Sequence, residues 1–245
     1  MARQTSVVTA RLAAQLGLDR HELVAIVGAG GKTTILHTLG RELAAGHLKV
    51  ILTTTTRMAP DQISESVCWS DDPIEVEKSL VPGAPLFVLL GHDSDKVVGL
   101  EPAAVDGLFT STSVDHIIVE ADGARTMSIK APAEHEPVIP TAATTVVVVM
   151  GADALGQPLR TVAHRVDRIT ALTGLTYDDL VTPEHAATIL LHPGGGLKGI
   201  PESSRIVIAI TKVSPSNAVP VRELTAIITG HPSVDRCIEL AQSTG

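Results

Sequence analysis

Residues Leu23 to Thr34 read Leu-Val-Ala-Ile-Val-Gly-Ala-Gly-Gly-Lys-Thr-Thr, and this stretch decides the fold. Five apolar residues typical of a buried strand lead into a cluster of glycines. A lysine and two threonines then open a segment whose apolar residues repeat at helical spacing as far as Leu43. A strand, a glycine loop and a Lys-Thr pair at the start of a helix form the layout of a phosphate-binding loop.

The residue types of this loop suit an anionic ligand. Glycines allow backbone N–H groups to turn toward an anion, and the start of the helix adds a partial positive charge. Lys32 is expected to contact the β and γ phosphate oxygens, and Thr33 to supply a hydroxyl for Mg²⁺, with Thr34 as the alternative because the threonine is doubled. The residues expected to bind the nucleotide are Gly28, Ala29, Gly30, Gly31, Lys32, Thr33 and Thr34.

The spacing of the loop departs from the usual pattern G-x-x-x-x-G-K-[ST]. Ile26 stands where that pattern has its first glycine, and the loop here is the shorter G-x-G-G-K-T-T. This form resembles the loop of the Mur-type amide ligases, G-x-x-G-K-[ST]-[ST]. The alternative is a plain glycine turn between a core strand and a helix, with Lys32 in solvent.

A second strand ends in two carboxylates, Glu120 and Asp122, within the stretch His116 to Arg125. Side chains alternate along a strand, so the two acids point to the same side. Two neighbouring acids repel each other unless a cation lies near them. We expect both to bind Mg²⁺ directly or through water, opposite the phosphate loop. The alternative is an acidic turn exposed to solvent.

The composition favours one α/β domain. The chain has 245 residues, of which 44% are hydrophobic but only 2% aromatic, so its core must be built from Val, Ile, Leu and Ala. We expect a P-loop NTPase-like fold with a mainly parallel sheet flanked by helices. Residues 1–155 would form the nucleotide-binding core, and residues 156–245 a carboxy-terminal part that completes the same domain.

The periodicity of the chain places the individual elements. A helix is expected to open at the loop and to end at Gly46, and residues 91–96 are expected to form a polar turn. Strands are expected at 23–27, 49–52, 67–69, 86–90, 116–120, 143–150, 205–210 and 234–238, and further helices at 6–15, 73–80, 102–108, 183–191 and 221–228.

The net charge and the cysteines indicate which partners the protein could bind and in which compartment it would be found. The net charge is −8 and no basic stripe is present, which argues against binding to nucleic acid. No apolar run reaches the roughly 18–20 residues that a membrane span needs, and the first residues lack the apolar core of a signal peptide. Cys68 and Cys237 are isolated from each other, so we expect free thiols in a cytoplasmic protein.

With these motifs in view, the sequence resembles the YqeC family, whose members are described as accessory proteins of selenium-dependent molybdenum hydroxylases, or selenium cofactor biosynthesis proteins. The resemblance implies a P-loop nucleotide-binding fold and a role in maturing a selenium-containing molybdenum hydroxylase or its cofactor. Its most specific part is the string Glu-His-Glu-Pro-Val-Ile-Pro. The stretches that carry it are Gly28–Thr34, Thr53–Met58, Glu120–Gly123, Lys130–Pro132, Glu134–Pro140, His164–Arg165 and Gly194–Gly199.

The identity of the nucleotide is suggested by a late stretch, Thr211-Lys212-Val213-Ser214, which follows a strand where P-loop GTPases carry N-K-x-D. That aspartate accepts from the N–H groups of guanine, and a serine hydroxyl would do so far more weakly. We therefore expect ATP rather than GTP.

The activity expected from these features is that of an ATP- and Mg²⁺-dependent hydrolase or phosphotransferase, acting by positioning and charge neutralisation. Lys32, Glu120, Asp122 and His135 are the candidate catalytic residues; a plain structural hydrogen bond is an equal alternative for His135. Two other classes stay open: a Mur-like ligase that forms an acyl phosphate, and a nucleotide-gated chaperone or insertase for the cofactor. Candidate contacts to a second substrate are Thr55, Arg57, Lys130, His135 and Arg165.

Overall fold

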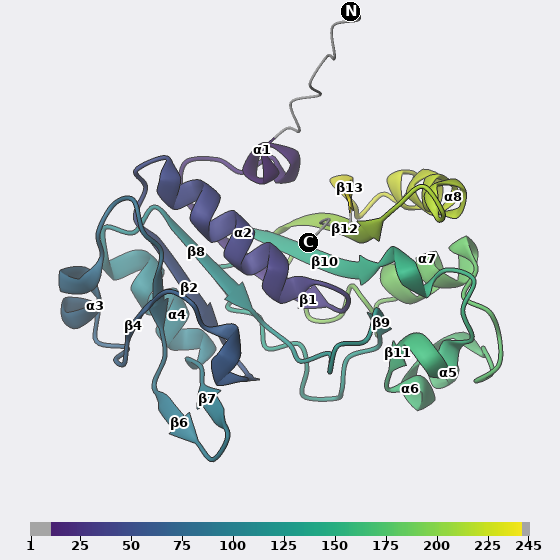
Figure 1. Cartoon of the computed structure of the whole chain (residues 1–245), viewed down its shortest axis with the longest axis horizontal. Helices are drawn as coiled ribbons and strands as arrows, with labels where there is room; N and C mark the ends of the chain where they lie inside the picture. The colour runs from purple at the N-terminus through teal and green to yellow at the C-terminus, as the bar shows by residue number, and fades with distance from the viewer. Residues whose placement is uncertain (1–10, 242–245) are drawn as a thin grey trace, which may run out of the picture.

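A parallel sheet of eight strands forms the centre of the protein in the computed structural model, which describes residues 11–241 (Figure 1). In chain order its strands are β1 (Glu22–Gly28), β2 (Val50–Thr54), β4 (Ser66–Cys68), β5 (Leu86–Val88), β8 (His116–Glu120), β10 (Thr145–Gly151), β12 (Arg205–Val213) and β13 (Arg236–Ala241). Across the sheet they lie in the order β13-β12-β10-β1-β8-β2-β5-β4. The expected α/β fold with a mainly parallel sheet flanked by helices is confirmed.

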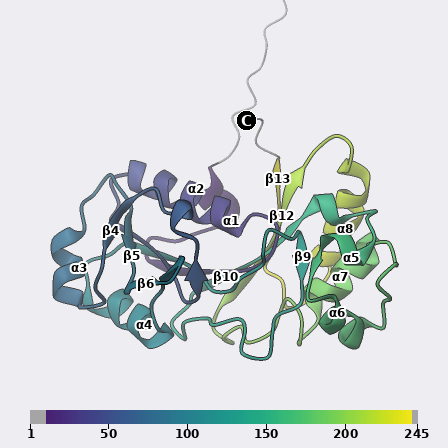
Figure 2. The ribbon, with the colours of Figure 1, turned by 60° about the horizontal axis from the view of Figure 1, so that its bottom comes forward.

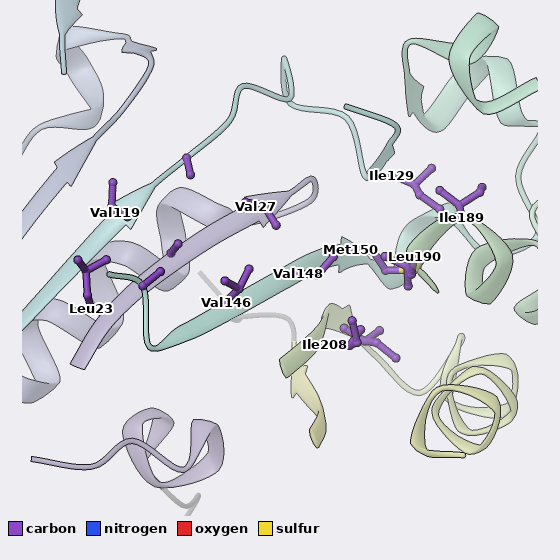
Figure 3. Packing of buried hydrophobic residues seen from close by; sticks show 14 of the residues in the cluster. Leu23, Val27, Val119, Ile129, Val146, Val148, Met150, Ile189, Leu190 and Ile208 are labelled. Carbon is purple, nitrogen blue, oxygen red and sulfur yellow. The ribbon is translucent and has the colours of Figure 1, made fainter. Parts of the chain in front are cut away.

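Helices cover both faces of this sheet (Figure 2). Leu23 and Val27 of β1 pack into the apolar cluster of one face, whereas Val24 and Ile26 pack into the cluster of the other. Figure 3 shows the first cluster, in which β1, β8 and β10 meet α7. The helices of that face include α3 (Pro73–Ser79), α4 (Pro102–Ser111), α7 (Pro183–Leu191) and α8 (Ala218–Thr229), and those of the opposite face are α1 (Leu12–Leu16) and α2 (Lys32–Ala45).

Smaller elements surround the carboxyl ends of the strands. β9 (Ile129–Lys130) and β11 (Ala163–His164) form a two-stranded parallel sheet. In the chain, α6 (Val166–Thr173) comes directly after β11. α5 (Leu159–Val162) precedes β11, and two short 3₁₀ turns lie at Pro60–Gln62 and Ala152–Ala154. β12 and β13, which come from the last part of the chain, continue the main sheet beside β10.

The polar turn expected at residues 91–96 is confined to Ser94 and Asp95, and the residues on either side form strands instead. This segment belongs to a hairpin of β6 (Gly91–Asp93) and β7 (Lys96–Val98), and β7 also pairs with β3 (Arg57–Met58). Val97 of β7 and Met58 of β3 lie opposite each other and are both buried, so two apolar side chains far apart in sequence favour strand pairing here.

The ends of several expected elements also differ: α4 runs to Ser111 instead of 108, and β12 runs to Val213 instead of 210. Of the helix expected at 6–15, residues 6–10 lie outside the described residues, and α1 runs from Leu12 to Leu16. The last helix begins at Ala218, three residues earlier than expected. None of the helices in residues 11–241 is both long enough and apolar enough to span a membrane.

The register of the sheet places three strand ends side by side. Ile26 of β1 lies opposite Glu120 of β8, and Gly28 lies opposite Val149 of β10. The chain leaves β1 toward β2 on one side and leaves β10 toward β12 on the other. Neighbouring strands whose connections diverge in this way open a crevice at the carboxyl edge of a parallel sheet, where ligands bind.

Candidate functional site

The glycine loop is held tightly against the end of β10. Gly28, Gly30 and Gly31 have φ angles of 96°, 83° and 131°, which L side chains rarely adopt. A Cβ atom on Gly28 would lie 2.3 Å from the carbonyl oxygen of Val149, and one on Gly30 would lie 2.3 Å from the nitrogen of Gly151. The loop therefore requires glycine both for its backbone conformation and for its close approach to β10.

Lys32, the first residue of α2, joins the loop to the two acids. Its Nζ donates a 2.9 Å hydrogen bond to the carbonyl oxygen of Gly28. The same atom lies 3.2 Å from Asp122 Oδ1 and 3.6 Å from Glu120 Oε1. Lys32 is only 4% exposed, so its charge is balanced inside the protein rather than by solvent. The structure thus brings together the lysine and both carboxylates that the sequence singled out.

The two adjacent threonines, Thr33 and Thr34, lie in different environments. Thr33 Oγ1 donates a 2.8 Å hydrogen bond to Glu120 Oε2. Thr34 is exposed and lines an open cavity along the side of α2. Of the two hydroxyls, only that of Thr33 faces the acids.

Asp122 connects the loop to a second lysine. Its Oδ2 accepts a 3.0 Å hydrogen bond from the Gly28 N–H and lies 2.8 Å from Lys130 Nζ. Its Oδ1 is buried and within ion-pair distance of Lys32, but accepts no hydrogen bond from any residue in 11–241. Because like charges side by side are unfavourable, the two lysines supply the positive charge that the acid pair needs.

Lys130 also belongs to a series of neighbouring side chains whose charges alternate in sign. Its Nζ donates to Glu136 Oε2 at 2.9 Å, and Arg165 holds the two oxygens of Glu136 at 2.6 and 2.9 Å. Burial by itself would raise the pKa of Glu136, but the hydrogen bonds from Arg165 and Lys130 outweigh burial and lower the pKa to about 2. The alternating chain runs from α2 to the start of α6.

The oxygens of Thr33 and Glu120 fit Mg²⁺, a hard cation that prefers oxygen ligands. Within residues 11–241 no group of three or more His, Cys, Asp or Glu side chains is placed to enclose a metal ion. This donor set suits an ion that keeps several waters and is bound mainly through phosphates, as Mg²⁺ is. It does not suit a structural zinc site, which needs four nitrogen or sulfur ligands.

An open cavity of about 690 Å³ adjoins the glycine loop. Glu42 is the acidic residue among those that line this cavity. Its two carboxylate oxygens already accept hydrogen bonds from backbone N–H groups of α1, from Leu12 at 2.7 Å and from Ala13 at 3.0 Å. The cavity is lined by Arg11, Leu12, Gln15, Gly30, Gly31, Thr34, Ile35, Thr38, Glu42, Thr211, Lys212, Leu240 and Ala241.

Comparison with known proteins identifies a family. A model of the YqeC protein family matches residues 24–167, which include the glycine loop, both acids, Lys130 and Arg165. The chain belongs to the YqeC family. A protein of Escherichia coli K12, named "Uncharacterized protein YqeC", is 34% identical over 216 residues, which cover 86% of this chain and 84% of that protein. No solved structure matches the chain.

Of the other candidates in the YqeC-matched region, Thr55 and Arg57 are held by structural contacts. Thr55 is half-buried, and its Oγ1 donates to the carbonyl oxygen of Val138 at 2.6 Å. Arg57 is exposed and pairs with Asp93 of the hairpin at 2.6 Å. His135 is exposed, and its side chain forms no hydrogen bond or ion pair within the described part of the chain. The backbone N–H of Thr55 donates to the carbonyl oxygen of Glu120 at 3.1 Å, so Thr55 adjoins the acids, whereas no contact joins Arg57 or His135 to Lys32, Glu120 or Asp122 within residues 11–241.

Sequence reasoning missed two residues that support the loop. Glu136 ties Lys130 to Arg165, and its position between His135 and Pro137, in a rigid segment rich in charge, was the available signal. Thr211 Oγ1 donates to the carbonyl oxygen of Gly30. The sequence drew attention to Thr211 only as a departure from the GTPase pattern, because its contact with the loop depends on the pairing of β10 with β12.

Proposed function

We propose that this YqeC protein binds a magnesium nucleotide at the loop Gly28–Gly31, with the fold of a P-loop NTPase, and that it hydrolyses the nucleotide or transfers its terminal phosphoryl group. One observation carries the proposal: a lysine at the start of α2 meets two strand-end acids directly after three glycines with positive φ. This arrangement supplies backbone N–H groups, a helix N-terminus and a cation at one point.

Each residue of the cluster has a role in this proposal. Lys32 would exchange its bond to the Gly28 carbonyl for the β and γ phosphate oxygens, and Thr33 and Glu120 would hold the magnesium ion. When bound, Mg²⁺ would neutralise charge on the phosphate oxygens. Asp122 keeps the Gly28 N–H fixed and so preserves the shape of the loop. The rate enhancement would come from positioning and electrostatic stabilisation.

The adjoining cavity supports ATP over GTP. It is large enough for a nucleoside and borders Gly30 and Gly31, where the phosphates would begin. Recognition of guanine needs a carboxylate that accepts from its N–H groups, but Glu42 already accepts from α1. Ser214 interacts with Asn217 and Ser216 instead. Within the described lining, no carboxylate is left to select guanine.

Calorimetric titration with ATP and GTP, each with and without Mg²⁺, tests the proposal. We expect Mg²⁺-dependent binding of ATP and much weaker binding of GTP. Tighter binding of GTP would overturn the argument about the base, and no binding of either would overturn the nucleotide assignment.

Replacement of Lys32 tests the residue that carries the proposal. Lys32→Ala should abolish nucleotide binding or turnover, because it removes the only lysine in contact with both acids and the loop among residues 11–241. Lys78→Ala, an exposed lysine on α3, is the control and should bind as the wild type does. Unchanged affinity and turnover of Lys32→Ala would contradict the assignment.

The cellular role in this proposal rests on the YqeC resemblance alone. The protein would use its nucleotide in the maturation of a selenium-dependent molybdenum hydroxylase or its cofactor. Nucleotide-dependent co-purification of the YqeC protein with such a hydroxylase would support this role. Failure to recover a hydroxylase, either with or without nucleotide, would argue for an enzyme that acts on a free substrate.

A further inference from the structure

All three donor positions of the Lys130 ammonium group are taken up by oxygens of the protein. Its side chain is 1% exposed, and its Nζ lies 2.6 Å from the carbonyl oxygen of Gly123, 2.8 Å from Asp122 Oδ2 and 2.9 Å from Glu136 Oε2. An ammonium group has three hydrogens, so three oxygens at these distances use its whole capacity to donate. A direct contact with nucleotide would require Lys130 to abandon one of these buried oxygens.

The proposed movement of Lys32 creates a need that Lys130 can meet. While Lys32 stays against Asp122, that buried carboxylate has two lysines beside it. Once Lys32 turns toward phosphate, Asp122 keeps only Lys130, and a buried carboxylate without a counterion is strongly unfavourable. The Gly28 N–H, which donates to Asp122, would lose its fixed partner if the carboxylate moved.

We propose that Lys130 is a positioning residue, which balances the charge of Asp122 and so allows Lys32 to leave it for a phosphate. The proposal rests on the proposed function above and changes the role expected for Lys130, from a ligand contact to a support of the loop. Glu136 and Arg165 serve the same purpose, because the two-point contact of Arg165 fixes the carboxylate that holds Lys130.

A double-mutant cycle separates support through Asp122 from direct contact. Nucleotide affinity is measured by calorimetry with Mg²⁺ and ATP for the wild type, Lys130→Met, Asp122→Asn and the double variant. Lys130→Met alone should weaken binding about tenfold or more, a coupling of the size seen between residues in contact. In the Asp122→Asn background the same substitution should change affinity by less than about twofold, because no carboxylate remains to be balanced.

Control variants distinguish a loss of nucleotide affinity from a general loss of folding. Lys198→Met removes another lysine from the same region and should leave nucleotide affinity unchanged, because the Nζ of Lys198 donates to the backbone carbonyls of Ala133 and Glu134 and, within residues 11–241, to no carboxylate. If Lys130→Met fails to fold, Glu136→Gln, which keeps the shape of the side chain, takes its place in the cycle. It should show a smaller loss of affinity that is likewise suppressed by Asp122→Asn.

The outcomes distinguish this inference from the function on which it rests. Suppression of the Lys130→Met defect by Asp122→Asn supports the positioning role. Equal losses in the two backgrounds, with nucleotide bound by the wild type, overturn the positioning role alone and return Lys130 to direct contact. An equal loss in Lys198→Met also overturns it, because the effect would then follow from loosening the segment. No binding by the wild type overturns both proposals.

Discussion

The hydroxyl of Thr33 donates a 2.8 Å hydrogen bond to Oε2 of Glu120, across the boundary between α2 and β8. Thr33 is the second residue of its helix and Glu120 the last residue of its strand, 87 positions later in the chain. The contact shows which of the two adjacent threonines faces the acids, and it is the point at which we propose that a magnesium ion binds.

Substitution of Thr33 should therefore affect the magnesium dependence of nucleotide binding. Thr33→Val keeps the shape of the side chain but removes the hydroxyl, so it should weaken Mg²⁺-dependent ATP binding about tenfold or more and leave Mg²⁺-free binding nearly unchanged. Thr33→Ser restores a hydroxyl and should bind as the wild type does. Calorimetry at several Mg²⁺ concentrations measures both. Equal affinities of the valine and serine variants would exclude a metal role for Thr33.

Because Gly28 packs closely on β10, replacing it with alanine should destabilise the fold more than the same replacement at Gly156. Gly28→Ala places a methyl group 2.3 Å from the carbonyl oxygen of Val149, whereas Gly156→Ala, at a φ of 76°, meets no atom within 4 Å. The second substitution should cost about 1–2 kcal/mol for its left-handed backbone alone. The first should cost clearly more, because the strand must move as well. Urea unfolding of both variants measures the difference, and equal costs would contradict the observed packing.

The low pKa of Glu136 predicts a loss of stability in acid. Its pKa lies at about 2 in the folded protein, against a usual value of 4.5. A lowered pKa stabilises the fold above the unfolded value, and this contribution disappears as the pH falls from 4.5 toward 2. Glu136→Gln should be less stable than the wild type at neutral pH, and the gap should shrink over that range. Unfolding experiments from pH 7 to pH 3 measure it, and a constant gap would refute the prediction.

Protonation of His116 should produce a second pH effect, at pH values below about 6.5. Burial lowers its pKa below the usual 6.5, opposed in part by the charges of Asp115 and Glu22 and assisted by His21. The unfolded chain then binds a proton more readily than the folded one, so acidification below about 6.5 favours unfolding. Burial also lowers the pKa of His164, which adds an effect of the same sign.

The variant His116→Leu isolates the contribution of this histidine. It removes a buried imidazole whose Nδ1 has no hydrogen-bond partner among residues 11–241. Thermal unfolding at several pH values should show a smaller loss of stability on acidification than in the wild type, with the effect of His164 remaining. The same pH dependence in both proteins would show that His116 does not titrate in this range.

Much of the candidate site could be predicted from the sequence because its signals are local. The loop Gly28–Lys32 is continuous, and its glycines are recognisable because few other residues adopt their φ angles. Glu120 and Asp122 end an apolar run, so their place at a strand end followed from alternation. The hairpin at 91–98 was missed because its support, Met58, lies far away in the chain.

The sequence by itself determined the chemistry of this protein: a glycine loop, a lysine, two threonines and a pair of strand-end acids, together with the apolar runs of a parallel sheet. Only the tertiary structure decided their partners. In the folded protein the hydroxyl of Thr33, not that of Thr34, donates to Glu120, and Lys130 is a buried counterion of Asp122. The reason is physical: residue type and short-range periodicity are properties of neighbours in the chain, whereas the balance of buried charges depends on which strands lie side by side.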